Sequence, residues 1–272
     1  MNPEEYERMH ALETDYWWFV GRRALVAQLL DATRPHLQTP SDCPLSLVDI
    51  GCGTGANLPM LRRAIAPDGQ VYGLDFSPLA LQWAQTEGDL NGGQIHLSQG
   101  DALSLPLRDG CADIVTMLDV LEHLSDDARA LGEVRRILRP GGALVLSVPA
   151  YQHLWSAHDE ALHHFRRYEK SGLNRVLSKA GFRVWRLSFA MSLMPPLAWF
   201  WRRFILPFQA RRPRDARRHS QGAVLPAVPE FANAMLARYV GAEGAIIARR
   251  PLRFGTSLVA VAFAPAEKTS AV

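Results

Sequence analysis

The run Asp49-Ile50-Gly51-Cys52-Gly53-Thr54-Gly55 constrains the fold of this chain more than any other feature. It follows the apolar segment 45–50 and precedes a helix that we predict over residues 57–66. A strand that turns through closely spaced glycines into a helix brings main-chain atoms close to a ligand. A dinucleotide fingerprint requires Gly-x-Gly-x-x-Gly. The Gly-x-Gly-x-Gly found here, with an acid two residues ahead, suits a ligand that carries a cation; taken alone, it is also compatible with a plain strand-to-helix turn.

Acidic residues follow the next predicted strands. Strand 70–74 ends in Asp75, twenty residues past Gly55, and strand 94–99 ends in Gly100-Asp101-Ala102. Strand 112–117 runs into Leu118-Asp119-Val120-Leu121-Glu122-His123. A helix over 126–138, a turn at 139–142 and a fifth strand over 143–148 come next. The carboxyl ends of parallel strands share one edge of a sheet, so these acids are expected to lie together there.

Each acid has a structural alternative. Asp75 at a strand end can accept both hydroxyls of a ribose, with Phe76 beside it as an apolar face for an adenine. The same stretch also reads as a helix entry, with Ser77 as the N-cap and Pro78 at the first helical position. Asp101 reads equally as a turn acid, and Asp119 and Glu122 as charges at a helix N-terminus.

This order of motifs resembles the class I S-adenosylmethionine-dependent methyltransferases over roughly residues 45–190 and again at the C-terminus. The resemblance implies S-adenosyl-L-methionine as the cofactor. It also implies that the glycine loop, Asp75 and Asp101 contact the methionyl, ribose and adenine parts respectively. The residues expected at the cofactor are Asp49, Gly51, Cys52, Gly53, Gly55, Asp75, Phe76, Asp101, Ala102 and Leu118.

Alternating strands and helices predict an α/β fold with a mostly parallel sheet covered on both faces. The resemblance implies a Rossmann-like sheet of seven strands, with the last two strands, 182–189 and 253–263, antiparallel at one edge. Ahead of strand 182–189 we expect a helix that Ser171 caps and that ends near Ala180, and between the last two strands a long insertion. The predicted organisation is an N-terminal helical lid (1–40), a cofactor-binding core (41–190), an apolar and Arg-rich insertion (191–252), and a final core strand with its tail (253–272).

The N-terminal part is expected to hold two helices, the second capped by Thr14 or Asp15. Its aromatic residues 16–19 precede an apolar stripe at helical spacing, which by default faces the core. The alternative is that some of these aromatic side chains, Trp17 and Trp18 in particular, roof the cofactor or the substrate.

Chemistry-bearing residues gather after the fifth strand. They resemble a segment of the methyltransferase-11 type, Trp-x-x-His-Asp-x-x-x-Gly-His-x-Arg-Arg-Tyr, except that His163 stands where glycine is usual. A histidine can accept a hydroxyl proton near neutral pH, and arginine presents a planar fork to a carboxylate or phosphate. The candidate catalytic bases are His123, His158 and His164, and the candidate substrate-binding residues are Trp17, Trp18, Tyr151, Asp159, Arg166, Arg167 and Tyr168.

Two other interpretations apply to this segment. Asp159 pairing with Arg166 or Arg167 would form a self-satisfied surface network that fixes a loop. A metal site is not predicted, because the histidines and the acid show no recognised ligand spacing.

The insertion carries a second signal. Residues 187–201 are nearly free of charge but fall short of the roughly twenty residues needed to cross a bilayer. From Arg202 to Arg218 there are seven arginines against one acid, Asp215. This combination favours contact with an anionic membrane surface over a substrate lid with solvated arginines, and nucleic acid is not favoured as a partner.

Composition fits an intracellular enzyme. The formal net charge is +3, and the three cysteines show neither paired nor metal-type spacing. The first five residues are acidic and lack an apolar core, so no secretion signal is expected. We therefore predict a cytoplasmic protein. The arginines of the segment 202–218 also suggest peripheral contact with the inner face of the membrane.

The predicted function is S-adenosylmethionine-dependent methyl transfer to the oxygen of a small-molecule, lipid-like or lipid-linked acceptor. The segment 119–123 resembles ubiquinone-pathway O-methyltransferases, whose substrates are apolar and prenylated. A methyltransferase acting on protein or RNA, a non-catalytic cofactor-binding scaffold and a nicotinamide dehydrogenase are the competing interpretations.

Overall fold

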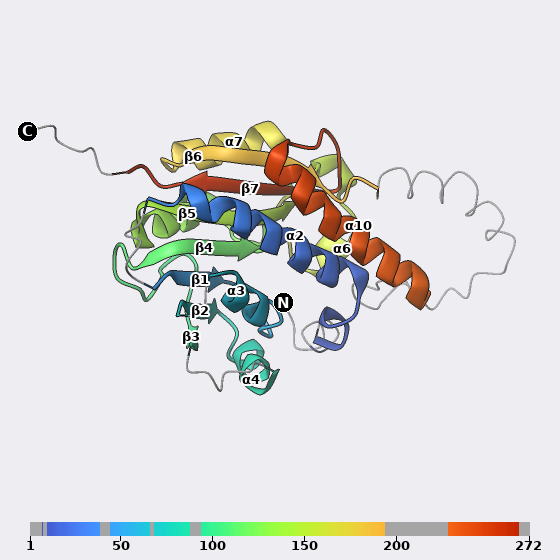
Figure 1. Cartoon of the computed structure of the whole chain (residues 1–272), viewed down its shortest axis with the longest axis horizontal. Coiled ribbons are helices and arrows are strands. Elements are labelled where there is room, and N and C mark those ends of the chain that lie inside the picture. The colour runs from blue at the N-terminus through green and yellow to red at the C-terminus, as the bar shows by residue number, and fades with distance from the viewer. Residues whose placement is uncertain are drawn as a thin grey trace, which may run out of the picture.

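Seven strands form one sheet in a computed structural model that describes residues 7, 10–38, 44–65, 68–87, 94–193 and 228–266. The strand order is β3-β2-β1-β4-β5-β7-β6, and only β7 runs against its neighbours, β5 and β6 (Figure 1). The predicted α/β, Rossmann-like, mostly parallel sheet of seven strands is therefore confirmed. The strands are β1 Ser46–Ile50, β2 Gln70–Asp75, β3 Ile95–Gln99, β4 Ala112–Leu118, β5 Leu138–Pro149, β6 Arg183–Ala190 and β7 Ser257–Phe263.

Helices cover both faces of the sheet. The α-helices are α2 Trp17–Thr33, α3 Leu58–Ala64, α4 Pro78–Glu87, α5 Asp127–Ile137, α6 Ala157–Ala161, α7 Lys170–Lys179 and α10 Glu230–Arg249. Short 3-10 turns occur at η1 Arg34–His36, η3 Leu121–His123 and η4 Gln152–Leu154.

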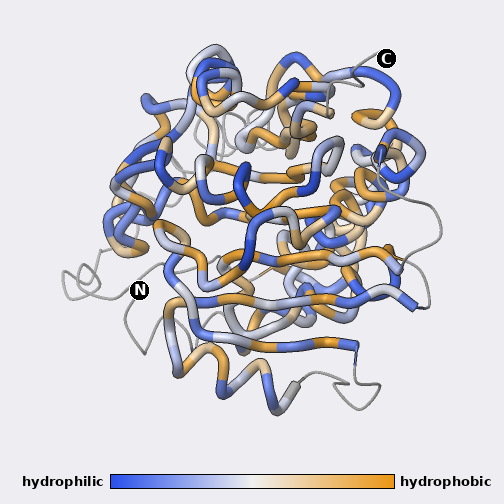
Figure 2. The backbone as a smooth tube through the Cα atoms, turned by 90° about the vertical axis from the view of Figure 1, so that its left-hand side faces the viewer, coloured by the Kyte–Doolittle hydropathy of each residue, from blue (hydrophilic) through white to orange (hydrophobic). Residues whose placement is uncertain are grey.

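Two hydrophobic cores follow from the alternation of side chains along the strands. In β4, Ile114 points into the core beneath α2, α3 and α10, whereas Val115 and Met117 point into the core beneath α5 and α7. Successive side chains of a strand face opposite sides, so a strand buried on both faces must be apolar throughout. Figure 2 shows this as hydrophobic stretches along the central strands.

The chain order reverses at the carboxyl ends of β1 and β4, which is where a ligand-binding crevice is expected in such a sheet. From β1 the chain builds outward through β2 to β3, then returns to add β4 on the other side of β1. The loops after β1 and β4 therefore leave in opposite directions. In open α/β sheets ligands bind at this reversal.

Three local predictions from the sequence are wrong. Neither Thr14 nor Asp15 caps α2; Asn233 of α10 does so from across the fold, accepting the Trp17 N–H at 2.8 Å. Ser171 does not cap α7, which begins one residue earlier, because the extended pairing of Tyr168 with Ala150 ends just before it. The turn predicted at 139–142 lies within β5, as an irregularity in its pairing with β4.

Small residues bring α2 and α10 into close contact on one face of the sheet (Figure 1). A methyl group at Gly21 would lie 2.7 Å from the Cβ of Val240, and one at Gly244 would lie 2.9 Å from the Cα of Leu25. Gly241 and Gly244 stand inside one unbroken 20-residue helix. Their lack of a side chain allows two backbones to approach.

This packing predicts opposite effects for two Gly→Ala changes. Gly244→Ala should lower the free energy of unfolding by about 1–3 kcal/mol, because the new methyl group meets the backbone of Leu25. Gly132→Ala, at an exposed position of α5 with open space around it, should raise it by about 0.5–1 kcal/mol. Urea unfolding measures both, and a Gly244→Ala variant as stable as the wild type would contradict the close approach.

Candidate functional site

The end of β2 holds the glycine loop in place. The N–H groups of Gly51 and Cys52 donate to the Leu74 carbonyl at 2.7 and 2.9 Å, and the Gly53 N–H donates to Oδ2 of Asp75 at 2.8 Å. The three loop glycines at 51, 53 and 55 have φ of 71°, 57° and 87°, a region that favours glycine. A side chain at Gly51 would strike Val120, whereas the space around a Cβ at Gly53 is open. The loop therefore presents a bare main-chain surface at Gly53.

Asp49 places a buried carboxylate beneath this loop. Its Oδ1 accepts a hydrogen bond from Thr116 at 2.6 Å, and its Oδ2 has no partner among the described residues. Burial raises its pKa to about 7, against the opposing effects of the Thr116 hydrogen bond and the charge of Arg22. An unpaired buried oxygen of this kind is suited to a cation arriving at the loop.

Asp75 stabilises the rim of the crevice and still has acceptor capacity. Its Oδ1 accepts the Ser77 N–H at 2.8 Å, and Ser77 caps α4 through the Ala80 N–H, as the helix-entry interpretation predicts. Each carboxylate oxygen has a second lone pair for a ligand hydroxyl. Burial raises the pKa of Asp75, and the N–H groups of Ser77 and Gly53 oppose the rise. Beside it, Phe76 is 73% exposed, an open apolar face at the rim.

The other expected cofactor residues differ in accessibility. Asp101 is exposed and uses Oδ1 to accept the Leu103 N–H at 2.8 Å, so it closes a turn and leaves Oδ2 at the surface. Ala102 next to it is half-buried. Leu118 and Cys52 are buried, and burial raises the pKa of the Cys52 thiol, which fits a small, unreactive side chain.

Asp159 organises the segment that follows β5. It is fully buried and accepts hydrogen bonds from Nε and Nη2 of Arg167 at 2.7 and 2.9 Å, and from the Ser156 N–H at 2.9 Å. Nδ1 of His164 lies 2.9 Å from its Oδ1. Burial raises its pKa, but the hydrogen bonds from Arg167 and His164 outweigh burial and bring it to about 2. An ionised, immobile carboxylate therefore orients the His164 ring.

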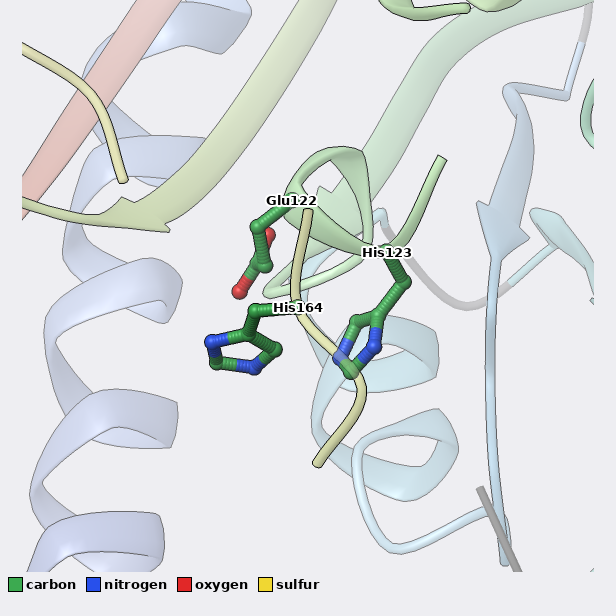
Figure 3. A group of neighbouring side chains, drawn as sticks. All are labelled: Glu122, His123 and His164. Carbon is green, nitrogen blue, oxygen red and sulfur yellow. The ribbon is translucent and has the colours of Figure 1, made fainter. Parts of the chain in front are cut away.

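Three side chains converge at the carboxyl end of β4, where the Glu122 carboxylate and the rings of His123 and His164 face one another (Figure 3). The imidazole centroids are 4.6 Å apart with the rings nearly perpendicular. Burial, and secondarily the neighbouring His164, lower the pKa of His123 to about 4, so its ring is neutral near pH 7. Burial and the charge of Asp119 raise the pKa of Glu122.

Arg22 reaches this edge from α2. It donates to Oδ2 of Asp119, whose Oδ1 accepts from Ser147 at 2.9 Å. Its guanidinium lies 4.5 Å from the centroid of the Trp18 ring. Trp18 thus packs on a buried cation, while Trp17 belongs to the hydrophobic core.

The remaining candidates are spread around the segment. Arg166 pairs with Asp127 at 2.9 Å, Tyr168 is buried with its hydroxyl donating to the same carboxylate, and Tyr151 stacks on Phe189. His158 is exposed on α6, outside the group in Figure 3. The predicted pairing of Asp159 with Arg167 is present, as a buried contact and not a surface one. Direct contact of these residues with a substrate stays a prediction.

Arg22 and Glu122 are not among the site residues that the sequence predicts. Arg22 was detectable as a charge on the apolar face of its helix, four residues after Trp18. Glu122 was detectable as an acid directly before His123 at a strand end. Their partners lie far away in sequence, so neither role follows from local spacing.

His163 adopts φ of 56°, the left-handed region. This is the position at which the resembling segment usually has glycine. Histidine at position 163 therefore keeps the left-handed backbone conformation that glycine would adopt, although its side chain is bulky.

Within the described residues, no helix is both long and apolar enough to span a bilayer. The Arg202–Arg218 cluster, and with it most of the predicted insertion, lies outside them.

Comparison with known proteins matches residues 48–146 to a family described as a methyltransferase domain. The demethylmenaquinone methyltransferase of Thermus thermophilus is 37% identical over 103 residues, which is 38% of this chain and 46% of that protein. The ajmaline N-methyltransferase of Rauvolfia serpentina is 30% identical over 186 residues, which is 65% of this chain and 60% of that protein. The chain thus spans less than two thirds of the length of these relatives.

Among solved structures, a chain of the complex between the Haloferax volcanii Trm112 methyltransferase activator and a methyltransferase superposes with a TM-score of 0.60. The superposition covers 97% of this chain and 96% of that one at 22% sequence identity. At that identity the likeness establishes the fold.

The open space at Gly53 predicts a specific loss of cofactor binding. Gly53→Leu should weaken binding of S-adenosylmethionine by more than about tenfold, because the new side chain enters the crevice. Gly181→Leu is the matched control: Gly181 also has positive φ and open surroundings but follows α7. Both changes should cost about 1–2 kcal/mol of stability. Calorimetric titration with S-adenosylmethionine distinguishes the effect on binding from the effect on stability. Equal cofactor affinity in the two variants would contradict a role of the glycine loop in cofactor binding.

The burial of Asp49 predicts a pH dependence of stability. Between pH 4 and 7 the folded protein retains a proton that the unfolded chain has released, so this residue's contribution falls as pH rises through that window. Asp49→Asn keeps an acceptor for Thr116 and removes the titration. The wild-type free energy of unfolding, minus that of Asp49→Asn, should therefore decline from pH 4 to 7 by at most about 4 kcal/mol. Urea unfolding at several pH values tests this, and a constant difference would exclude it.

Proposed function

We propose that this chain is a class I S-adenosylmethionine-dependent methyltransferase that methylates an oxygen atom of an apolar, lipid-like or lipid-linked small molecule. The cofactor of the family is S-adenosylmethionine. The observation that carries the oxygen-acceptor proposal is the imidazole of His164, fixed by buried Asp159 beside Glu122 at the crevice.

The crevice residues fit this cofactor. The unpaired Oδ2 of Asp49 offers negative charge where an amino group would lie, and the bare surface at Gly53 leaves room for the methionyl chain. Asp75 retains lone pairs for the ribose hydroxyls, and exposed Phe76 offers a flat surface for the adenine. When bound, the cofactor supplies a methyl group on a positively charged sulfur.

The protein's contribution is alignment and the exclusion of water. The sulfonium leaving group is already activated, so the rate depends on holding the acceptor atom in line with the methyl carbon in a dry pocket. Arg22 and Asp119 close the crevice from the α2 side, where Trp18 covers the guanidinium. The segment held by Asp159 closes it from the β5 side.

An oxygen acceptor also needs help to lose its proton. His123 alone is a weak base, because its pKa lies near 4. The ionised carboxylate of Asp159 holds the His164 ring in one orientation. The same carboxylate would stabilise a positive charge on that ring once it accepts a proton. We therefore assign the handling of the acceptor proton to the group Glu122, His123 and His164, with Asp159 as the residue that positions it.

The apolar character of the acceptor rests on two supports. The segment Asp119–His123 resembles ubiquinone-pathway O-methyltransferases, and one relative is named for demethylmenaquinone, a prenylated ring. An amine is the second candidate acceptor, because another relative is named an N-methyltransferase. A neutral amine needs no base to become nucleophilic, so the two candidates respond differently to changes at Asp159.

Transfer of labelled methyl from S-adenosylmethionine into fractions of a lysate tests the proposal. We expect the label in the organic extract, as a base-stable methyl ether. Label in protein or RNA would refute the acceptor class, and bound cofactor with no transfer at all would favour a non-catalytic scaffold.

With an acceptor in hand, Asp159→Asn should lower kcat about 10–100-fold and leave cofactor affinity unchanged, because it frees the His164 ring without touching the glycine loop. Asp109→Asn, which alters an exposed ion pair with Arg136, is the control and should leave kcat unchanged. An unaltered kcat in Asp159→Asn would favour the amine acceptor.

A further inference from the structure

The group in Figure 3 has the composition of a metal site. Glu122, His123 and His164 each offer one ligand atom, and these atoms all lie within 4.8 Å of one another. Two imidazole nitrogens and one carboxylate oxygen form the donor set of catalytic zinc sites that keep one position open. Ligand atoms around tetrahedral zinc are roughly 3.3 Å apart, since the metal–nitrogen distance is about 2.0–2.1 Å. Small side-chain rotations therefore suffice to close the set.

Both imidazoles have one nitrogen already engaged by a protein acceptor. Nδ1 of His164 lies 2.9 Å from Oδ1 of Asp159, and His123 hydrogen-bonds to the backbone of Leu162. The other nitrogen of each ring is available as a ligand atom. A carboxylate that holds the far nitrogen of a ligand histidine is the usual support of a protein-bound metal ion, because it fixes the tautomer and the ring orientation.

Glu122 supplies the second, independent indication. It is 1% exposed, and its Oε2 has no hydrogen-bond partner among the described residues. A buried carboxylate oxygen without a partner is costly unless a positive charge lies nearby. The charges of Arg22 and Arg167 act on Glu122, but these guanidiniums donate their hydrogen bonds to Asp119 and Asp159 respectively.

We propose that Glu122, His123 and His164 bind one divalent transition-metal ion of the Zn²⁺ type, with an open coordination position directed to the acceptor oxygen. Mg²⁺ is not the expected occupant, because it prefers oxygen ligands in an octahedral arrangement. This inference replaces the sequence-based prediction of no metal. His123 and His164 are 41 residues apart and on different elements, so no local spacing reveals them.

The role of the ion rests on the proposed function, whereas its binding does not. A divalent cation lowers the pKa of a hydroxyl bound to it. With the ion bound, His164 acts as a ligand and not as the base, so the acceptor's O–H bond breaks and its proton passes to solvent. The oxygen lone pair forms the new O–C bond as the carbon–sulfur bond of the cofactor breaks. The neighbouring Asp159–Arg167 pair keeps the ligand set rigid during this exchange.

Zn²⁺ binding to the untagged, full-length chain tests the site without cofactor or acceptor. We expect one ion per chain by calorimetry, and X-ray absorption at the zinc edge should show two imidazoles in the first shell. Glu122→Gln and His164→Asn should each weaken binding at least about tenfold, and Asp159→Asn about 10–100-fold. His96→Asn, which changes an exposed histidine that contacts Gln70, is the matched control and should bind as the wild type does.

Several outcomes would overturn the site. These are no stoichiometric Zn²⁺, equal affinity in wild type, Glu122→Gln and His164→Asn, or an absorption spectrum without imidazole ligands. Mg²⁺ that displaces Zn²⁺ at equal concentration would also contradict it. Should the ligand variants fail to fold, the absorption spectrum of the wild-type protein decides alone.

The proposed metal site and the proposed methyl transfer can be refuted independently. Zinc bound with this signature but no methyl transferred would leave the site standing and refute the proposed function. Methyl transfer that is unaffected by chelation, in a chain that retains no zinc, would leave the proposed function standing and refute the metal site.

Discussion

A concentration of buried carboxyl groups at one edge of the sheet shapes this molecule. Four buried or nearly buried carboxylates, Asp49, Asp119, Glu122 and Asp159, gather at the carboxyl ends of β1, β4 and β5. Among the described residues, two guanidiniums reach into them: Arg22 pairs with Asp119 and Arg167 pairs with Asp159. Asp49 and Glu122 each keep one oxygen without a partner. Buried charge of this kind is retained only where something compensates it, so the two unpaired oxygens mark two places for positive charge.

In the proposed function these two places have different roles. Asp49, under the glycine loop, would bind the cationic cofactor. Glu122, in the turn η3 that follows β4, would lie where the acceptor approaches. Because β1 and β4 are hydrogen-bonded neighbours in register, the sheet fixes the separation of these two carboxyl groups. Catalysis by alignment requires such a rigid frame.

The sequence allowed the strands, the glycine loop and the acids at the strand ends to be predicted, because each depends on local periodicity or on fixed spacing. Ser77 as a helix cap and the Asp159–Arg167 pair were predictable for the same reason. What escaped prediction depends on residues distant in sequence. Arg22 finds its partner on another element, His123 meets His164 only in the folded chain, and the cap of α2 comes from Asn233. His163 was predictable only in part. The resemblance showed that this position usually holds glycine, and the positive φ of His163 in the structure explains why.

The cap that Asn233 supplies to α2 has a consequence for biogenesis. Donor and acceptor are 216 residues apart, and the glycine-lined contact between α2 and α10 spans the same separation. During synthesis the first long helix leaves the ribosome well before its partner, with its apolar stripe uncovered. Contacts of such long range form late and slow folding. The apolar face of α2 is therefore a natural client for a chaperone until α10 has been synthesised.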